Sequence, residues 1–179
     1  MTACEPHVVH QPRTSVIVPV YNKAPHLKAC FDCLECQTIS KSDLEVLLID
    51  DGSTDDSLAL CEAFAAERPW VRVIAQPNAG VSEARNAGIR AANGRYLFFL
   101  DPDDSLSPET LENVSMFFES CPDEIDLVTY PIVSIRDGKR QRLHHRYDVL
   151  RETGVYDLTL PENATVAQAT MNVAVRNCF

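Results

Sequence analysis

The sequence predicts an α/β domain in which helices flank a mostly parallel sheet. Short apolar runs alternate with segments of helical periodicity, an order that is typical of βαβ units. Clusters of polar residues come directly after three of these runs, where parallel sheets bind ligands. The 179 residues are 45% hydrophobic, which suffices to bury the core of one such domain.

The first two strand–helix units follow a polar leader, which we assign to residues 1–13. "TSVIVPV" (14–20) is a continuous apolar run, as expected of a strand that is buried on both faces. A helix over 25–38 follows it. "LEVLLID" (44–50) predicts the second strand, and the second helix is expected over 54–67.

Three further strands continue the alternation. "VRVIAQ" (71–76) predicts the third strand, and a helix over 82–93 leads to the fourth strand, "RYLFFL" (95–100). The next helix is expected over 107–121. "DLVTYPIV" (126–133) predicts the fifth strand.

Several residues mark the expected helix ends. Ser53, with Asp56 three residues later, is a capping signal for the second helix. Gly94 is a typical stop after the third helix. Ser107 and Pro108 open the fourth helix, with proline at its first position.

The three cysteines of "CFDCLEC", Cys30, Cys33 and Cys36, recur every three residues in the first helix. An iron–sulfur motif would need a fourth cysteine followed by proline, and a zinc site would need a further Cys/His pair. We therefore expect these cysteines on one buried helix face, as small hydrophobic residues. The total of seven thiols is odd, which fits a reducing compartment.

The charge and hydropathy of the chain exclude several classes of protein. A net charge of −10 repels nucleic acid, so we expect no nucleic-acid partner. No apolar stretch approaches the roughly 18 residues of a transmembrane segment. The N-terminus also lacks the pattern of a secretory signal. We expect a cytoplasmic protein, held at the inner face of the membrane if missing parts attach it.

The chemistry is expected where three polar clusters follow predicted strands: "PVYN" (19–22), "DDGSTDDS" (50–57) and "DPDD" (101–104). The carboxyl ends of parallel strands meet at one edge of a sheet, so the clusters should converge there. The carboxylates of the third cluster repel one another and raise one another's pKa. A positively charged partner is the simplest reason for such a cluster.

Other readings of these acids are weaker. The chain lacks the glycine signatures of dinucleotide and nucleoside triphosphate sites. An aspartate-dependent phosphatase uses two aspartates separated by one residue, whereas Asp50 and Asp51 are adjacent and should point to opposite sheet faces. An EF-hand loop starting at Asp101 would need glycine where Leu106 stands.

Residues 14–120 resemble the nucleotide-binding half of an inverting family 2 glycosyltransferase with the GT-A fold. The resemblance rests on "SVIVPVYN", "LEVLLIDDGSTDDS" and "NAGVSEARNAGIRAANGRYLFFLDPDD", in this order and spacing. It implies a Rossmann-like, mostly parallel sheet that is truncated at the acceptor side. It also implies a UDP-sugar donor, Mn²⁺ or Mg²⁺ as cofactor, and a glycan or lipid-linked acceptor in surface polysaccharide synthesis.

The resemblance also assigns residues. Tyr21 would stack on uracil, with Pro19 and Asn22 beside it, and Asp51 would hydrogen-bond the edge of the base. The implied ligands of ribose and metal are Asp101, Asp103 and Asp104, with Asp103 on the donor as well. Arg85 would contact phosphate, or else be an ordinary surface arginine. A divalent cation on these carboxylates would neutralise the charge of the leaving diphosphate.

We assign residues 14–133 to the nucleotide-sugar-binding core and 134–179 to the start of an acceptor-side region. Asp137-Gly138 predicts a hairpin turn, and the basic residues around it form either a solvated hairpin or a wall for an anionic acceptor. The segment 164–179 predicts a helix or a strand.

Inverting transfer needs a general base. None of the acids after Asp126 has the family's Glu-Asp setting, so we expect an incomplete chain without a catalytic base. A binding module without transfer activity is the alternative.

Overall fold

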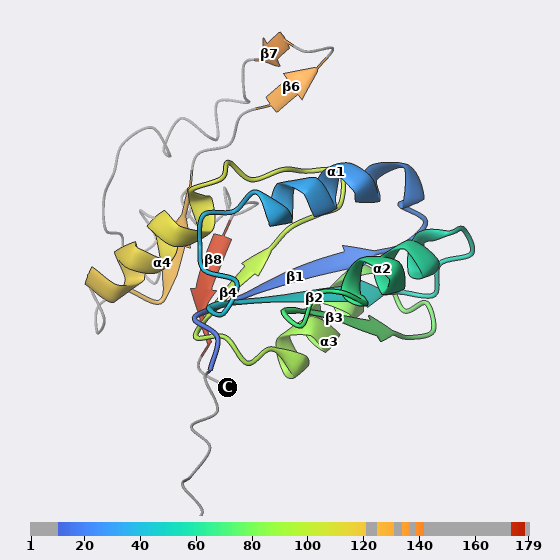
Figure 1. Cartoon of the computed structure of the whole chain (residues 1–179), viewed down its shortest axis with the longest axis horizontal. Helices are drawn as coiled ribbons and strands as arrows, with labels where there is room; N and C mark the ends of the chain where they lie inside the picture. The colour runs from blue at the N-terminus through green and yellow to red at the C-terminus, as the bar shows by residue number, and fades with distance from the viewer. Residues whose placement is uncertain (1–10, 121–124, 131–133, 137–138, 142–172, 178–179) are drawn as a thin grey trace, which may run out of the picture.

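The computed structural model of the chain describes residues 11–120, 125–130, 134–136, 139–141 and 173–177. Six strands form one sheet in the order β3-β2-β1-β4-β8-β5 (Figure 1). They are β1 (Thr14–Val20), β2 (Leu44–Asp50), β3 (Val71–Ala75), β4 (Tyr96–Phe99), β5 (Leu127–Thr129) and β8 (Val173–Arg176). The first four are mutually parallel, and β8 pairs antiparallel with both β4 and β5. The expected mostly parallel sheet is confirmed.

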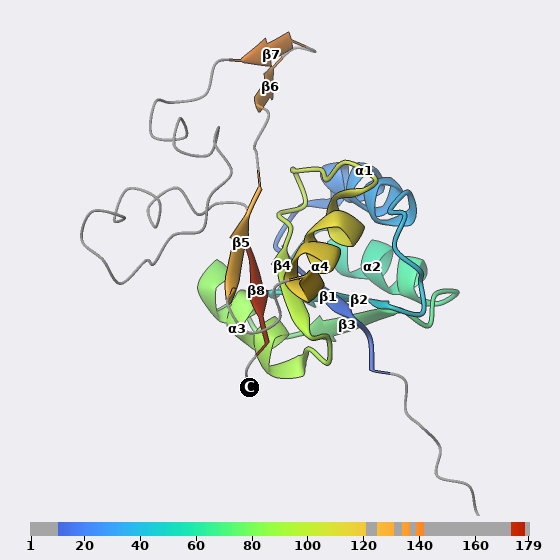
Figure 2. The same cartoon turned by 90° about the vertical axis from the view of Figure 1, so that its left-hand side faces the viewer.

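Helices cover both faces of this sheet (Figure 2). They are α1 (Ala24–Glu35), α2 (Ser57–Ala65), α3 (Val81–Ala91) and α4 (Thr110–Ser120). Side chains of α1, α2 and α4 pack in one hydrophobic cluster with alternate residues of β1 and β2. The intervening residues of these strands pack against α3 in a second cluster. Every residue of β1 and β2 is buried, as the continuous apolar runs predicted.

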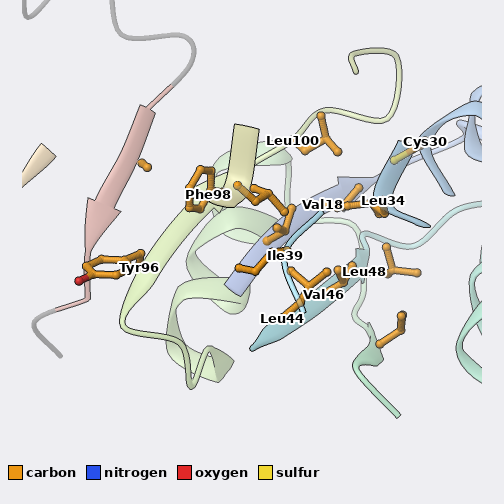
Figure 3. Packing of buried hydrophobic residues seen from close by; sticks show 14 of the residues in the cluster. Val18, Cys30, Leu34, Ile39, Leu44, Val46, Leu48, Tyr96, Phe98 and Leu100 are labelled. Carbon is orange, nitrogen blue, oxygen red and sulfur yellow. The ribbon is translucent and has the colours of Figure 1, made fainter. Parts of the chain in front are cut away.

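Figure 3 shows the larger cluster from nearby, with side chains of three neighbouring strands and of α1. The labelled residues are Val18, Cys30, Leu34, Ile39, Leu44, Val46, Leu48, Tyr96, Phe98 and Leu100. The ring of Tyr96 also stacks on Phe118 of α4, with centroids 4.5 Å apart. These contacts fix β4, and with it the chain that leaves β4 at the acidic cluster.

The second cluster is closely packed because α3 carries small residues toward β1. A Cβ atom added at Gly88 would overlap Cγ2 of Ile17 and lie 3.1 Å from its Cγ1. Ala84 on the same helix is fully buried. The backbone of α3 therefore lies directly on the sheet.

Two helix starts differ from the expectation. α2 begins at Ser57 rather than at residue 54, and α4 begins at Thr110 rather than at residue 107. Ser53 does not cap α2, because its Oγ accepts a hydrogen bond from the Asn22 backbone at 3.1 Å. Asp55 serves both the loop and the helix, because its carboxylate accepts from Ala24 N at 3.2 Å and from Ser57 N, the first amide of α2, at 3.0 Å.

The expected buried cysteine stripe is only partly present. Cys30 is buried and Cys33 is half-buried, but Cys36 is exposed because α1 ends one residue before it. Burial is the largest cause that raises the pKa of Cys30 to about 12, so this thiol is inert at neutral pH.

Two further strands, β6 (Ser134–Arg136) and β7 (Lys139–Gln141), pair antiparallel, so the expected hairpin is present. The turn residues Asp137 and Gly138 lie outside the described residues. The closing segment, for which the sequence left helix and strand open, contains β8.

Candidate functional site

The three predicted polar clusters lie at one edge of the sheet, where β1, β2 and β4 end. Backbone hydrogen bonds hold the exits of these strands together: Asp51 N donates to Val20 O at 2.8 Å, and Leu100 N to Ile17 O at 3.0 Å. The neighbouring strand joins them, since Gln76 N donates to Asp50 O at 2.9 Å. The sequence-predicted convergence is therefore present in the fold.

Asn22 ties the first cluster to the second. Its backbone has a positive φ of 51°, a conformation that asparagine tolerates better than most residues. Its side-chain Oδ1 accepts from the backbone amides of Thr54 at 2.8 Å and Asp55 at 3.3 Å. Asn22, expected beside the base, thus has its acceptor oxygen engaged in shaping the loop.

Asp51 organises the chain that leads into α3. Its buried carboxylate accepts three hydrogen bonds, from Gln76 Nε2 at 2.7 Å, Ala79 N at 2.9 Å and Gly80 N at 2.8 Å. Burial alone would raise the pKa of Asp51, but these hydrogen bonds outweigh burial and lower it. A carboxylate has about four lone-pair sites. One acceptor position therefore remains for a ligand.

The glycine between Asp51 and Ser53 lets the two loops approach each other. Gly52 has a φ of 72°, and an added Cβ would lie 2.7 Å from the backbone nitrogen of Asn78. Any larger residue would separate the loop after β2 from the loop that enters α3.

Asp50 lies on the other face of β2, as adjacent strand positions require. Its Oδ2 accepts from Ser53 N at 3.2 Å, and its charge contributes to raising the pKa of Cys61 on α2, after the larger effect of burial. Asp50 and Asp51 do not share a site, which counts against the two-aspartate phosphatase.

The acidic cluster after β4 is partly neutralised by two basic side chains. Lys23 Nζ donates to Asp103 Oδ2 at 2.7 Å, and Arg85 Nη2 donates to Asp101 Oδ1 at 2.7 Å. The Nε of Arg85 is buried and without a hydrogen-bond partner in the described part of the chain. Among those residues, the side chain of Asp104 forms neither a hydrogen bond nor an ion pair.

Because of these pairings, the pKa values of Asp103 and Asp104 shift in opposite directions. The hydrogen bond from Lys23 is the largest cause that lowers the pKa of Asp103. Desolvation raises the pKa of Asp104, and repulsion by Asp101 and Asp103 raises it further. The repulsion between carboxylates that the sequence predicted therefore raises the pKa of Asp104.

The three aspartates do not converge on one point. Within the described ranges, no group of three acidic, histidine or cysteine side chains has the arrangement of a metal site. The expected ligand set of Asp101, Asp103 and Asp104 is thus not preformed, because Arg85 and Lys23 hold two of the carboxylates.

The second half of α1 and the residues directly after it anchor the loop that follows the acidic cluster. Cys33 Sγ accepts from Leu106 N at 3.1 Å, and Gln37 Nε2 donates to Ser107 O at 3.1 Å. Thr38 N donates to Pro108 O at 2.9 Å. The middle cysteine of the spaced triplet is therefore a loop anchor, a role that its spacing did not indicate.

Tyr21 is the aromatic residue at this edge. It follows β1 directly, and the residue is 47% exposed, so a ligand can reach it. Pro19 is buried within β1 and paired in register with Ile49 of β2. Only backbone of Pro19 can face a ligand here.

Lys23 and Gln76 are site residues that the sequence reasoning missed. A signal for Lys23 was available, because a lysine two residues after Tyr21 stands at the same strand end as the acids. Gln76 was read as the last residue of a strand, whereas β3 ends at Ala75. Gln76 thus lies just after the strand, and its side chain donates a hydrogen bond to Asp51.

The acids considered as a general base lie outside the described residues: Asp137, Asp148, Glu152, Asp157 and Glu162. The histidines and the basic residues Arg142 and Arg146 of the expected acceptor wall also lie outside them. Within the described part of the chain, no helix combines the length and apolar character that crossing a membrane requires.

Comparison of sequences gives one family. The model of glycosyl transferase family 2 matches residues 15–177. The minor teichoic acid biosynthesis protein GgaB of Bacillus subtilis is 43% identical over 119 residues, which are 66% of this chain and 13% of GgaB. The hyaluronan synthase of Pasteurella multocida is 38% identical over 106 residues, 59% of this chain and 11% of the synthase. The chain thus spans a small part of these relatives.

Solved structures agree with the sequences. S. aureus TarS 1–349 in complex with UDP superposes with a TM-score of 0.66 at 26% identity, over 75% of this chain and 39% of TarS. The mannosyltransferase PcManGT from Pyrobaculum calidifontis, in complex with GDP-Man and Mn²⁺, has a TM-score of 0.62 at 26% identity. That match covers 69% of this chain and 36% of PcManGT. Together these likenesses identify the sheet and its helices as a GT-A fold.

Proposed function

Because this chain belongs to glycosyl transferase family 2, we propose that it binds a UDP-sugar with Mn²⁺ or Mg²⁺ and supports transfer of the sugar, with inversion, to a glycan or lipid-linked acceptor in surface polysaccharide synthesis. One observation carries the proposal. An exposed aromatic ring, a buried carboxylate with one spare acceptor position and an acidic cluster with an unpaired member occupy one sheet edge.

The base end of the donor belongs beside Tyr21 and Asp51. An exposed ring can stack on a base, and this contact favours uracil no more than other bases. The remaining acceptor position of Asp51 suits the N–H of uracil, which supplies the preference. Pro19 contributes backbone to this pocket, and Asn22 holds its shape.

The diphosphate end belongs beside Lys23, Arg85 and the acidic cluster. Both cations now engage carboxylates, and the unsatisfied Nε of Arg85 is a ready donor for a phosphate oxygen. Mn²⁺ and Mg²⁺ commonly use one or two carboxylates and take their other ligands from phosphate and water. Asp104 fits this need, with Asp101 and Asp103 beside it.

When bound, the divalent cation would act as a Lewis acid that stabilises the charge of the leaving diphosphate. TarS with UDP and PcManGT with GDP-Man and Mn²⁺ support this assignment by likeness of fold. GgaB and the hyaluronan synthase support a role in polysaccharide or teichoic acid synthesis.

Calorimetric titration of UDP tests the proposal. We expect UDP to bind more tightly with Mn²⁺ than with a chelator, and Asp104→Asn to remove most of this difference. Asp32→Asn, which removes an exposed carboxylate on α1, is the matched control and should bind as the parent chain does. Tyr21→Ala should weaken UDP by about 1–3 kcal/mol, the usual value of base–aromatic stacking. Equal affinity with Mn²⁺ and with the chelator would refute the metal-dependent donor site.

A further inference from the structure

A tyrosine outside the predicted clusters reaches the acidic end of β4. Tyr130 follows β5, and its ring packs against Phe98 of β4, with centroids 6.3 Å apart and planes tilted by 33°. Phe98 lies three residues before Asp101. Because β5 joins the sheet through β8, this position of Tyr130 depends on the antiparallel part of the fold.

The hydroxyl of Tyr130 is buried and has no hydrogen-bond partner among the residues that the structure describes. A buried hydroxyl without a partner destabilises a folded protein, because it loses its hydrogen bonds to water. Phenylalanine would supply the same ring without this cost. The packing of this ring against Phe98 therefore does not explain why the residue is a tyrosine.

The nearby group that complements the hydroxyl is Asp104. Burial, the larger cause, and the negative charge of Asp104 together raise the pKa of Tyr130 to about 12, which indicates that Asp104 lies within electrostatic reach of the hydroxyl. Asp104 has no hydrogen-bond donor within the described ranges. At the end of β4 there are thus a buried donor and a carboxylate acceptor that have no other partner within the described residues.

We propose that Tyr130 is a positioning residue for the donor site: its hydroxyl donates a hydrogen bond to the Asp104 carboxylate when Asp104 binds the divalent cation. This inference rests on the proposed function. A carboxylate that ligates a metal is commonly held by such an outer hydrogen bond, and losing the outer partner typically costs about 10–100-fold in metal affinity. The bond would also satisfy the Tyr130 hydroxyl.

The variant Tyr130→Phe keeps the ring and removes only the hydroxyl. In the absence of UDP, we expect the variant to bind Mn²⁺ at least about tenfold more weakly than the parent chain does. Electron paramagnetic resonance of Mn²⁺ measures this affinity. UDP should be weakened in the presence of Mn²⁺ and unchanged in a chelator. The unliganded variant should be as stable as the parent or more stable, because an unpaired buried hydroxyl is gone.

Tyr96→Phe is the matched control, since Tyr96 is a buried tyrosine at the opposite end of β4 and also stacks on a phenylalanine. It should leave the affinities for Mn²⁺ and UDP unchanged. A purely structural role of the Tyr130 hydroxyl would instead lower the melting temperature and leave metal affinity unaltered, which would overturn the inference.

The outcomes separate the two proposals. If the parent chain binds UDP equally with Mn²⁺ and chelator, the proposed function fails and the role of Tyr130 falls with it. If the parent needs Mn²⁺ and Tyr130→Phe retains full affinity for Mn²⁺ and UDP, only the role of Tyr130 is refuted.

Discussion

Single carboxylates stabilise this fold when enough donors surround them. Glu45, at the start of β2, is buried and accepts hydrogen bonds from the backbone and side chain of Asn93 at 2.8 and 2.7 Å. Ser15 and Arg72 also donate to it. Burial alone would raise the pKa of Glu45, but these four hydrogen bonds outweigh burial and lower it below the ordinary value of 4.5.

Glu45→Gln should therefore destabilise the protein in a pH-dependent way. A lowered folded-state pKa means that the carboxylate adds stability above pH 4.5, the unfolded value, and that this contribution is lost as the pH falls through the folded value. At pH 7 we expect a loss of about 1–3 kcal/mol. The difference from the parent should shrink below pH 4.5.

Urea unfolding of both proteins at several pH values measures this difference, with the exposed Glu67→Gln as the control. An equal loss at pH 7 and below pH 4 would show that the charge of Glu45 has no part in its stabilising effect.

The sequence pointed to the acids that lie at this edge of the sheet, but not to their partners in the fold. Asp51 and the cluster from Asp101 to Asp104 were identified because they follow apolar runs. The pairing of Lys23 with Asp103 joins positions 80 residues apart. Such a contact depends on how two loops approach in three dimensions, which local sequence does not encode.

Among the elements, α3 is held to the sheet at both ends by two carboxylates, one near the start of β2 and one directly after its end. Asp51 accepts from the amides of Ala79 and Gly80 just before α3, and Glu45 accepts from Asn93 just after it. Gly88 fixes the distance between the middle of the helix and β1.

Gly88→Ala should destabilise the protein, although alanine is the better helix former by about 1 kcal/mol. The added methyl group overlaps Ile17, and such overpacking typically costs about 1–3 kcal/mol. Urea unfolding measures the change. Asn86→Ala, on the exposed face of α3, is the control and should be neutral or stabilising.

A double-mutant cycle identifies the cause. In a background with Ile17→Ala, the space for the new methyl group exists, so Gly88→Ala should cost less than in the parent. Additive losses would mean that the clash with Ile17 is not the reason.

Helix starts were less predictable than helices themselves, for a physical reason. Ser53 has the side chain of a helix cap, but it accepts from the backbone of Asn22 in the neighbouring loop, and Asp55 divides its carboxylate between Ala24 N and Ser57 N. A side chain that can cap a helix can equally serve a loop. Sequence spacing does not distinguish these uses.

For the whole molecule, the alternation of strands and helices predicted the parallel half of the sheet. Consecutive βαβ units have one preferred handedness, and β1, β2 and β3 lie beside one another, whereas the chain crosses back after β3 to place β4 beside β1. The position of β8 was not predictable, because it depends on pairing with β4 and β5 rather than on the sequence around it. The same holds for Tyr130, which reaches the site through β5.

Binding of donor and cation should stabilise the whole fold. A ligand that binds only the folded state adds about 2.7 kcal/mol at 100 times its dissociation constant. For a chain of this size, that corresponds to a rise in melting temperature of roughly 5–10 °C. We expect this rise with UDP and Mn²⁺ together in a thermal unfolding scan, and a smaller one with UDP and a chelator.

Asp104→Asn provides the internal check. Its unliganded melting temperature should not fall, because repulsion within the acidic cluster is relieved, whereas the increment due to UDP and Mn²⁺ should decrease. An unchanged increment would exclude Asp104 from cation binding.

The place of β8 in the sheet also sets an order of assembly during synthesis. Phe99 and Val173 are 74 positions apart, which the ribosome covers in about 4–15 s at roughly 5–20 residues per second. Over that interval β4 is an edge strand with unpaired backbone groups, a template for pairing with other nascent chains. β5 cannot close this edge earlier, because its place in the sheet is beside β8. The step that removes this hazard is therefore the docking of residues 173–176.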